Sequence, residues 1–251
     1  MEPREPQDRI DPMIGRGAGE WDRLVSGLPP VSVPWPPVGP IVVVAPHPDD
    51  ELLAAGATLA AASDAGTEIT VVAVTDGEAS HPHLTGGERD ELVGLRLAET
   101  DRAYAAAGIV AVRHRLGLPD GGASDHEGHL AERLAALLAG AAWCLAPWES
   151  DGHPDHDVSG RVAGDTCRDL GVRFARFPVW SWNWDDPSSP SIPFDRAVAW
   201  SFDNDMAARK QAGIAAYSSQ VQPADGHRPV LPAGFLEHFA RCSEVFLPVA
   251  D

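Results

Sequence analysis

The sequence predicts an α/β fold in which a mostly parallel β-sheet lies between two layers of helices. Short apolar runs alternate along the chain with longer segments of helical character, the pattern of strands joined by right-handed helical crossovers. The first run, residues 41–45, is apolar throughout, as expected for a strand buried on both faces. With 251 residues, 44% of them hydrophobic, the chain can bury one sizeable core.

The first strand–helix–strand unit extends from residue 41 to residue 75. Residues 49–65 are rich in Ala and Leu and form the expected helix, which ends near Gly66 because glycine favours the left-handed conformation that closes many helices. Residues 68–75 are rich in β-branched side chains and form the second strand.

Later units repeat this alternation. A long helix is expected at residues 88–107, because Gly108 ends its pattern, and the apolar run that follows indicates a third strand. The Gly- and Asp-rich stretch 119–128 indicates a loop. The remaining expected elements are strands at 110–116, 142–147, 172–179, 197–202 and 244–247, helices at 130–138, 158–170 and 205–217, and loops at 148–157 and 223–232.

Two regions divide the chain. Residues 1–40 are rich in Pro and Gly and are expected to form an irregular N-terminal arm, pinned to the body by Trp21 and Trp35. Residues 41–251 are expected to form a single domain, because the strand–helix pattern begins at residue 41 and no internal repeat follows.

The charge of the chain limits its partners. The formal net charge is −18, and Lys210 is the only lysine. Nucleic acids and anionic membrane surfaces both attract clustered Lys and Arg, so we expect neither nucleic-acid binding nor membrane insertion. The partner expected is a small-molecule substrate, and the sequence leaves open whether the chain forms a homo-oligomer.

Cysteine usage and the N-terminal residues indicate the compartment. Cys144, Cys167 and Cys242 are widely spaced, without a C-x-x-C pair, which is typical of reduced, buried thiols. The first residues lack the apolar core of a signal peptide, and no apolar run approaches the ~20 residues that span a bilayer. We therefore expect a cytoplasmic protein.

The first chemical signal is the sequence His47-Pro-Asp-Asp-Glu51, directly after the first expected strand. His47 and Asp50 are three residues apart across a helix start, so both can point to one side and serve as zinc ligands. Asp49 then points elsewhere and can accept a proton from a bound water, while Glu51 supports the site from behind. Alternatively, the three acids only complement the helix dipole, at about 0.3–1 kcal/mol each.

The second signal is the sequence His153-Pro-Asp-His156, which follows the fourth expected strand. Both signals therefore lie at the carboxyl edge of the sheet, where open parallel sheets bind ligands. With His156 as third ligand, one zinc position stays open for water, which is the catalytic arrangement. His153 is then free to act as a donor, and Asp155 or Asp157 can orient an imidazole. Alternatively, the segment is a polar loop that caps the next helix.

The paired His motifs resemble those of the PIG-L / LmbE-like zinc-dependent N-deacetylases. Weaker features of that family occur in order over about residues 41–220, among them Thr75-Asp-Gly-Glu78 and Arg96-x-x-Glu99. The resemblance implies a Rossmann-like three-layer fold and hydrolysis of an N-acetyl group, often on a glucosamine unit.

The resemblance also assigns roles to residues. It implies one zinc ion on His47, Asp50 and His156, Asp49 as general base and His153 as the donor to the oxyanion. Arg96 and Asp120 fall where the family binds sugar hydroxyls. Alternatively, Arg96 pairs with Glu99 on its helix, and Asp120-Gly-Gly is ordinary turn chemistry.

Two segments depart from the family pattern. Some members carry an aromatic residue just before the second cluster, where this chain has Asp151-Gly152. The segment Trp180-Ser-Trp182-Asn-Trp184 would place its indoles on one side if extended, with Trp182 contacting a sugar ring or an apolar aglycone; the alternative is packing of a loop or a subunit contact.

The sequence thus predicts a zinc-dependent hydrolase that removes an N-acetyl or other N-acyl group from an amino-sugar glycoconjugate. One alternative is an amidase that acts on a thiol–sugar conjugate. Another, of a different class, is a zinc- and glycoside-binding protein without turnover.

Overall fold

Seven strands form one sheet, in the order β3-β2-β1-β4-β5-β7-β6, in the computed structural model, which describes residues 10–223 and 226–248. Strands β1 to β5 are parallel, whereas β7 runs antiparallel to both of its neighbours. The strands are β1 (Ile41–Ala45), β2 (Ile69–Thr75), β3 (Val112–Leu118), β4 (Trp143–Pro147), β5 (Arg173–Phe177), β6 (Val198–Ser201) and β7 (Ser243–Pro248).

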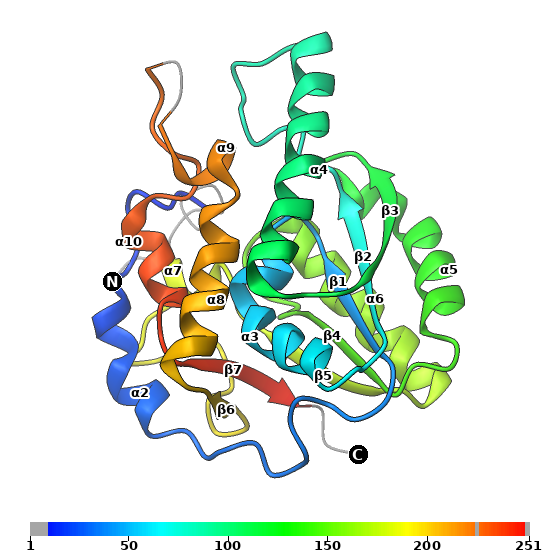
Figure 1. Ribbon diagram of the computed structural model, residues 1–251, viewed down its shortest axis with the longest axis vertical. Coiled ribbons are helices and arrows are strands. Elements are labelled where there is room, and N and C mark those ends of the chain that lie inside the picture. The colour runs from blue at the N-terminus through cyan, green and yellow to red at the C-terminus, as the bar shows by residue number, and fades with distance from the viewer. Residues whose placement is uncertain (1–9, 224–225, 249–251) are drawn as a thin grey trace.

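Helices cover both faces of this sheet (Figure 1). Helices α3, α4 and α8 lie on one face, and α5 and α6 on the other. The described helices are η1 (Ala18–Trp21), α2 (Asp22–Ser26), α3 (Asp50–Asp64), α4 (Gly87–Ala107), η2 (Ala123–His126), α5 (Glu127–Leu138), α6 (Pro154–Leu170), α7 (Ser181–Trp184), α8 (Asn204–Ala215), α9 (Ser218–Val221), α10 (Ala233–Leu236) and η3 (Glu237–Phe239).

Strand β1 is the centre of the core because every one of its residues is buried. Ile41 and Val43 belong to the apolar cluster on the side of α3, while Val42 and Val44 belong to the cluster on the side of α5 and α6. Successive side chains of a strand point to opposite faces, so a continuous apolar run fills both layers. The predicted three-layer α/β fold with a mostly parallel sheet is confirmed.

Four local expectations were wrong. Residues 119–128 and 148–157 are not loops throughout, because η2 lies within the first range, α5 begins at Glu127 and α6 begins at Pro154. The segment that follows Trp180 forms the helical turn α7 instead of an extended strand, so its indoles do not share one side. Cys242 is exposed, whereas Cys144 and Cys167 are buried; all three thiols are free.

The arm is held by the two tryptophans expected to pin it. Trp21 is fully buried, and its Nε1 donates to the carbonyl oxygen of Trp182 at 2.9 Å. Trp35 Nε1 donates to Thr58 Oγ1 at 3.0 Å, and its ring packs on Phe246. The arm is more regular than expected, since it contains η1 and α2.

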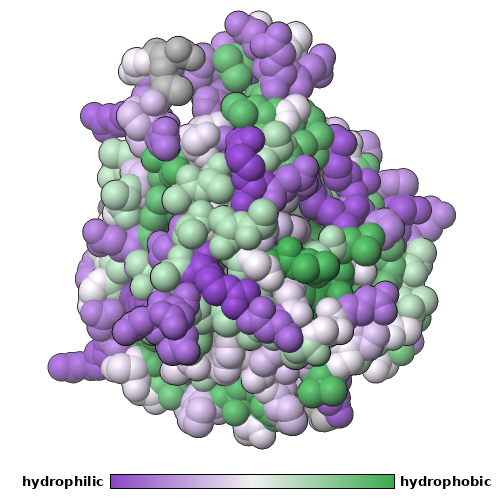
Figure 2. All heavy atoms as spheres, viewed as in Figure 1, coloured by the Kyte–Doolittle hydropathy of each residue, from purple (hydrophilic) through white to green (hydrophobic). Residues whose placement is uncertain are grey.

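Figure 2 shows hydrophilic side chains spread over the face seen in Figure 1, with separate hydrophobic groups between them. Across residues 10–223 and 226–248, no helix combines the length and the apolar character that crossing a membrane requires.

A buried ion pair joins α8, α3 and β7. Lys210 Nζ lies 2.9 Å from Glu244 Oε1, and both side chains are almost completely shielded from solvent. Helix α3 is irregular at Ala55, and the Glu244 carboxylate accepts the nearby N–H groups of Ala57 and Thr58 at 2.8 and 2.9 Å. Glu244 therefore satisfies the backbone at this irregularity, while Lys210 neutralises its charge.

His238 lies between the arm and the body, where it is 4% exposed. Its Nε2 donates to the carbonyl oxygen of Arg16 at 3.0 Å, and its ring stacks on Trp182. Burial lowers the pKa of His238 to about 4; the hydrogen bond to Arg16 opposes this shift, and the charge of Arg241 adds to it. The folded protein therefore binds a proton at His238 only at a lower pH than the unfolded chain, in which the pKa of histidine is near 6.5.

The stability contributed by neutral His238 is complete above about pH 6.5 and is lost as the pH falls toward 4, by roughly 3 kcal/mol at most. The variant His238→Gln keeps a donor for Arg16, so we expect it to flatten the decline in unfolding free energy across this window. Urea unfolding at several pH values measures this effect. Exposed His129→Gln is the control, and equal slopes for both variants would contradict the assignment.

Candidate metal centre

The two histidine motifs meet because β1 and β4 are neighbours in the sheet. Ile41 pairs with Trp143 and Val43 with Leu145, in parallel register, so both strands end at the same edge. From β1 the chain builds β2 and β3 on one side, then returns to form β4 on the other. Ligands bind at such a switch point in open α/β sheets. The expectation that both motifs share one edge is confirmed.

Three donor atoms form a compact triangle at this edge. His47 Nδ1 lies 3.2 Å from Asp50 Oδ2, and His156 Nε2 lies 3.1 Å from the same oxygen. The two nitrogens are 3.3 Å apart, although the residues are separated by 109 positions in the sequence. The structure thus brings together the three residues that the sequence predicts as ligands.

The triangle fits zinc in size and chemistry. Donor atoms of a tetrahedral site with bonds of about 2.0–2.1 Å lie about 3.3–3.4 Å apart, and two imidazoles with one carboxylate are common zinc ligands. Two other groups also have their ligand atoms within 4.8 Å of one another, namely His47 with His153 and His156, and His47 with Asp120 and Asp155. The triangle that contains Asp50 combines two imidazoles with one carboxylate, and all three of its edges lie between 3.1 and 3.3 Å.

The field of the surrounding carboxylates favours a cation. Burial lowers the pKa of His156, but Asp50 and Asp151 outweigh it and raise that pKa to about 9. The pKa of His47 is likewise raised well above its usual value, because hydrogen bonds to Asp120, Asp155 and Asp50 overcome the effect of burial. The negative potential that stabilises protons on both imidazoles would equally stabilise a divalent ion.

Each imidazole of the triangle is oriented through its second nitrogen. His47 Nε2 lies 3.2 Å from Asp120 Oδ1 and 3.3 Å from Asp155 Oδ2. His156 Nδ1 lies 2.9 Å from Asp151 Oδ2. Carboxylates in this position fix the tautomer and raise the basicity of a metal-binding histidine. The expectation of an orienting role for Asp155 is therefore supported.

Asp151 was missed as a positioning residue in the sequence analysis. Its carboxylate also accepts the N–H groups of Val179, Trp180 and Ser181, and it is fully buried. The only sequence signal was an acid in the loop directly after a buried strand. Its partners come from the segment after β5, so neither spacing nor periodicity identified them.

The variant Asp151→Asn is expected to weaken zinc binding by about 10–100-fold, because the amide orients His156 less strongly. Calorimetric titration of zinc into chelator-treated protein measures the loss. Urea unfolding of the same sample separates this effect from a general loss of structure. An unchanged zinc affinity would show that Asp151 acts only on the backbone near Trp180.

Asp49 lies beside the triangle and is held by Arg96. The Arg96 guanidinium is 2% exposed and donates to Asp49 Oδ2 at 2.9 Å and to the carbonyl oxygen of Pro48 at 2.8 Å. Gly77 permits this approach: its φ is +70°, and a Cβ there would lie 1.8 Å from the guanidinium. Asp49 itself has a φ of 153°, a conformation that costs about 1–3 kcal/mol outside glycine.

His153 stands at the N-terminus of α6. Its Nδ1 accepts a hydrogen bond from the backbone N–H of Asp155, so the neutral ring carries its proton on Nε2. Burial lowers the pKa of His153 to about 3, and repulsion by His47 and His156 adds to the shift. The ring of Trp180 stacks on His153 at 6.1 Å, so an aromatic residue does adjoin it, supplied by the segment after β5.

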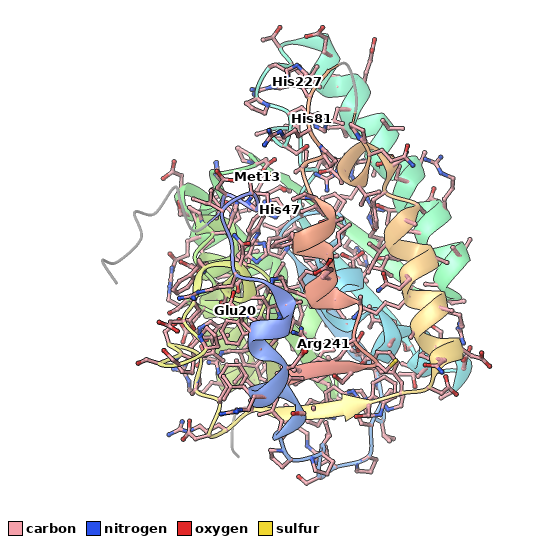
Figure 3. The ribbon with its side chains drawn as sticks, turned by 90° about the vertical axis from the view of Figure 1, so that its left-hand side faces the viewer. Met13, Glu20, His47, His81, His227 and Arg241 are labelled. Atoms are coloured by element: carbon pink, nitrogen blue, oxygen red, sulfur yellow. The ribbon has the colours of Figure 1, made fainter. Side chains whose placement is uncertain are left out.

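A cavity of about 230 Å³ opens over these groups, and His47, which Figure 3 labels, is one of its lining residues. Arg96 and Asp120, the predicted sugar contacts, line it, as do Asp49, Asp50 and His153. Trp182 does not line it: this residue is buried against Trp21 and Phe194, and Trp180 faces the cavity instead. The structure therefore does not bring Trp182 to the predicted site.

Comparison with known proteins shows which protein family this chain is similar to. Residues 42–167 match the family model described as PIG-L, GlcNAc-PI de-N-acetylase. The chain is 32% identical to the 1D-myo-inositol 2-acetamido-2-deoxy-alpha-D-glucopyranoside deacetylase of Tsukamurella paurometabola, over 73% of its own length and 84% of that relative.

Solved structures share the fold at lower identity. The zinc-inhibited form of teicoplanin deacetylase Orf2 superposes with a TM-score of 0.61 at 18% identity, covering 84% of this chain and 98% of that one. GalB, the 4-carboxy-2-hydroxymuconate hydratase of Pseudomonas putida KT2440, gives a TM-score of 0.55 at 15% identity, covering 85% and 97%. The same fold therefore occurs in a deacetylase and in a hydratase, so the function of this chain has to be argued from the residues of its site.

Proposed function

Because the chain belongs to the PIG-L family, we propose that it hydrolyses the N-acetyl group of an N-acetylglucosaminyl conjugate with one zinc ion held by His47, Asp50 and His156. The observation that carries this proposal is the triangle of donor atoms with edges of 3.1–3.3 Å. When bound there, zinc would polarise the amide carbonyl and acidify a water molecule. The inositol-linked substrate named for the Tsukamurella relative is one member of this class.

Asp49 is proposed as the general base that accepts the proton of the attacking water. Burial raises the pKa of Asp49 to about 7, although the charge of Arg96 opposes this shift. A carboxyl group with a pKa near the working pH can both accept a proton and return it. Arg96 holds Asp49 Oδ2 at 2.9 Å, so we assign it the role of positioning the base.

His153 is proposed to stabilise the oxyanion through Nε2–H, because Nδ1 is occupied by the backbone N–H of Asp155. A histidine with a lowered pKa donates a hydrogen bond as the neutral ring, whose N–H is too weak an acid to protonate the leaving amine. The proton for the leaving amine therefore comes back from Asp49. Asp120 Oδ1, which borders the cavity, is proposed to accept a sugar hydroxyl as well as to orient His47.

The size of the cavity limits the part of the substrate that enters it. About 230 Å³ is below the ~300–1,000 Å³ of pockets that enclose drug-sized ligands. One acetamido sugar ring is therefore expected inside, with the rest of the conjugate extending out of the mouth. The three free thiols support the expected location in a reducing compartment.

Two measurements test this function. Acetate release from N-acetylglucosaminyl conjugates is followed with zinc-loaded protein, and zinc is titrated calorimetrically into chelator-treated wild type and His156→Ala. We expect turnover, one zinc per chain, and loss of tight binding in the variant. His129→Ala, on the exposed side of α5, should match the wild type. Zinc binding without release of any acid would support the non-catalytic alternative.

A further inference from the structure

The cavity has two halves of different origin. The catalytic half comes from the segment that matches the family model and includes His47, Asp49 and His153. The lining residues from outside that segment, apart from Gln220, form an apolar wall, which we define as Val179, Trp180, Val230, Leu231 and Phe235. Every residue of the apolar wall lies outside residues 42–167. Part of the lining that surrounds the substrate therefore comes from outside the segment that matches the family model.

The apolar wall is already assembled without a ligand. Trp180 packs on Phe235 with ring centroids 4.8 Å apart, and its backbone N–H donates to Asp151 Oδ2 at 2.9 Å. Since that oxygen also contacts His156, the wall is fixed relative to the predicted metal ligands. Leu231 is tied by its N–H to the carbonyl oxygen of Gln220 at 2.8 Å.

The segment that carries Val230 is also held from the outer end. His227 stacks on His83 with ring centroids 3.9 Å apart, which joins this segment to the loop between β2 and α4. Figure 3 shows His227 and His81 at the top of the view, above His47. Val230, whose side chain is half-buried, lines the cavity on this segment.

The apolar character of the wall determines which chemical groups of a substrate can bind against it. A hydroxyl that faces an apolar surface loses its hydrogen bonds to water without replacement, whereas an apolar group gains about 25 cal/mol per Å² buried. Resting on the deacetylase function proposed above, we propose that the substrate carries an apolar group, of the size of one aromatic ring or a short alkyl chain, close to the scissile amide. This distinguishes it from a conjugate whose second part is a polyol.

An apolar group near the amide can be carried on the glycosidic oxygen or on the acyl carbon. The experiment therefore compares kcat/KM for N-acetylglucosamine, its phenyl glycosides, its inositol glycoside, and N-phenylacetylglucosamine. We expect the preferred phenyl-bearing compound to exceed both N-acetylglucosamine and the inositol glycoside by about tenfold or more. Which of the phenyl compounds is preferred identifies the position of the apolar group.

A conservative variant tests the wall itself. Val230→Thr keeps the shape of the side chain but adds a hydroxyl, so the ratio of kcat/KM for the preferred phenyl compound to that for N-acetylglucosamine should fall about fivefold. Val110→Thr, at a valine that is 78% exposed, is the matched control and should leave the ratio unchanged. If Val230→Thr left this ratio of kcat/KM values at the wild-type value, a role for the apolar wall would be contradicted.

A binding measurement separates this inference from the proposed function. Phenyl glucosaminide and methyl glucosaminide, which carry no amide, are titrated calorimetrically into wild type and Val230→Thr. Tighter binding of the phenyl compound without turnover of any amide would overturn the deacetylase function but uphold the apolar site. Turnover of N-acetylglucosamine without any phenyl preference, in rate or in binding, would overturn the apolar site alone.

Discussion

Replacing Asp49 with Asn is expected to lower kcat by about 10²–10⁴-fold, the usual contribution of a general base. The amide has almost the same shape and can still accept a hydrogen bond from Arg96, but it cannot take a proton from water. Because Asp49 is not part of the donor triangle, zinc affinity should change little. Steady-state acetate release and calorimetric zinc titration, made on the same sample, measure both quantities.

Asp76→Asn is the control for this substitution. Asp76 pairs with the exposed Arg115 at 2.8 Å, near the edge strand β3, and has no contact with the donor triangle. Its kcat should equal that of the wild type. A kcat for Asp49→Asn within a factor of three of the wild type would exclude Asp49 as the base, and the water would then need another proton acceptor.

The second large effect is expected from Lys210→Met, which should lower the free energy of unfolding by about 3–5 kcal/mol. The substitution leaves the Glu244 carboxylate buried without its cation, and burying an unpaired charge is among the most destabilising single changes known. Three donors from Ala57 and Thr58 remain, so the carboxylate keeps hydrogen bonds but loses its neutralising charge. Urea unfolding at pH 7 measures the change.

The neighbouring Arg209 provides a matched control. It lies on the same helix and pairs with Asp64 at 2.6 Å, but at the surface. Arg209→Met should therefore cost only about 1 kcal/mol. The double variant Lys210→Met/Glu244→Gln, which removes the charge but keeps an acceptor for α3, should be more stable than Lys210→Met alone. Equal losses for the Lys210 and Arg209 variants would contradict the importance of the buried charge.

The meeting of the three residues of the donor triangle could be predicted from the sequence because each lies within a few residues of a strand end. The apolar run before His47 identified β1, and the one before His153 identified β4. Parallel sheets place such ends at one edge, so the meeting of the two motifs required no knowledge of the strand order. The strand order itself, and the antiparallel pair β6 and β7, depend on long-range pairing that local patterns do not encode.

Residues that act through distant partners could not be predicted in the same way. Asp151 binds backbone groups of the segment after β5, and Glu244 binds backbone groups at an irregular position in α3. Neither partner is indicated by spacing along the chain. The prediction for Trp182 was wrong because it assumed an extended segment with alternating side chains. The segment forms a helical turn, so the indole of Trp182 points into the core and Trp180 lines the cavity instead.

The burial of Lys210 shields the only lysine side chain of the chain from reagents that modify amines. Since it is the only lysine and is 2% exposed, acylating dyes and amine-directed cross-linkers find no lysine side chain on the folded surface. Modification of Lys210 requires the contact between α8 and β7 to open. The rate at which this single ε-amine is labelled therefore measures how often the contact between α8 and β7 opens, without any engineered probe.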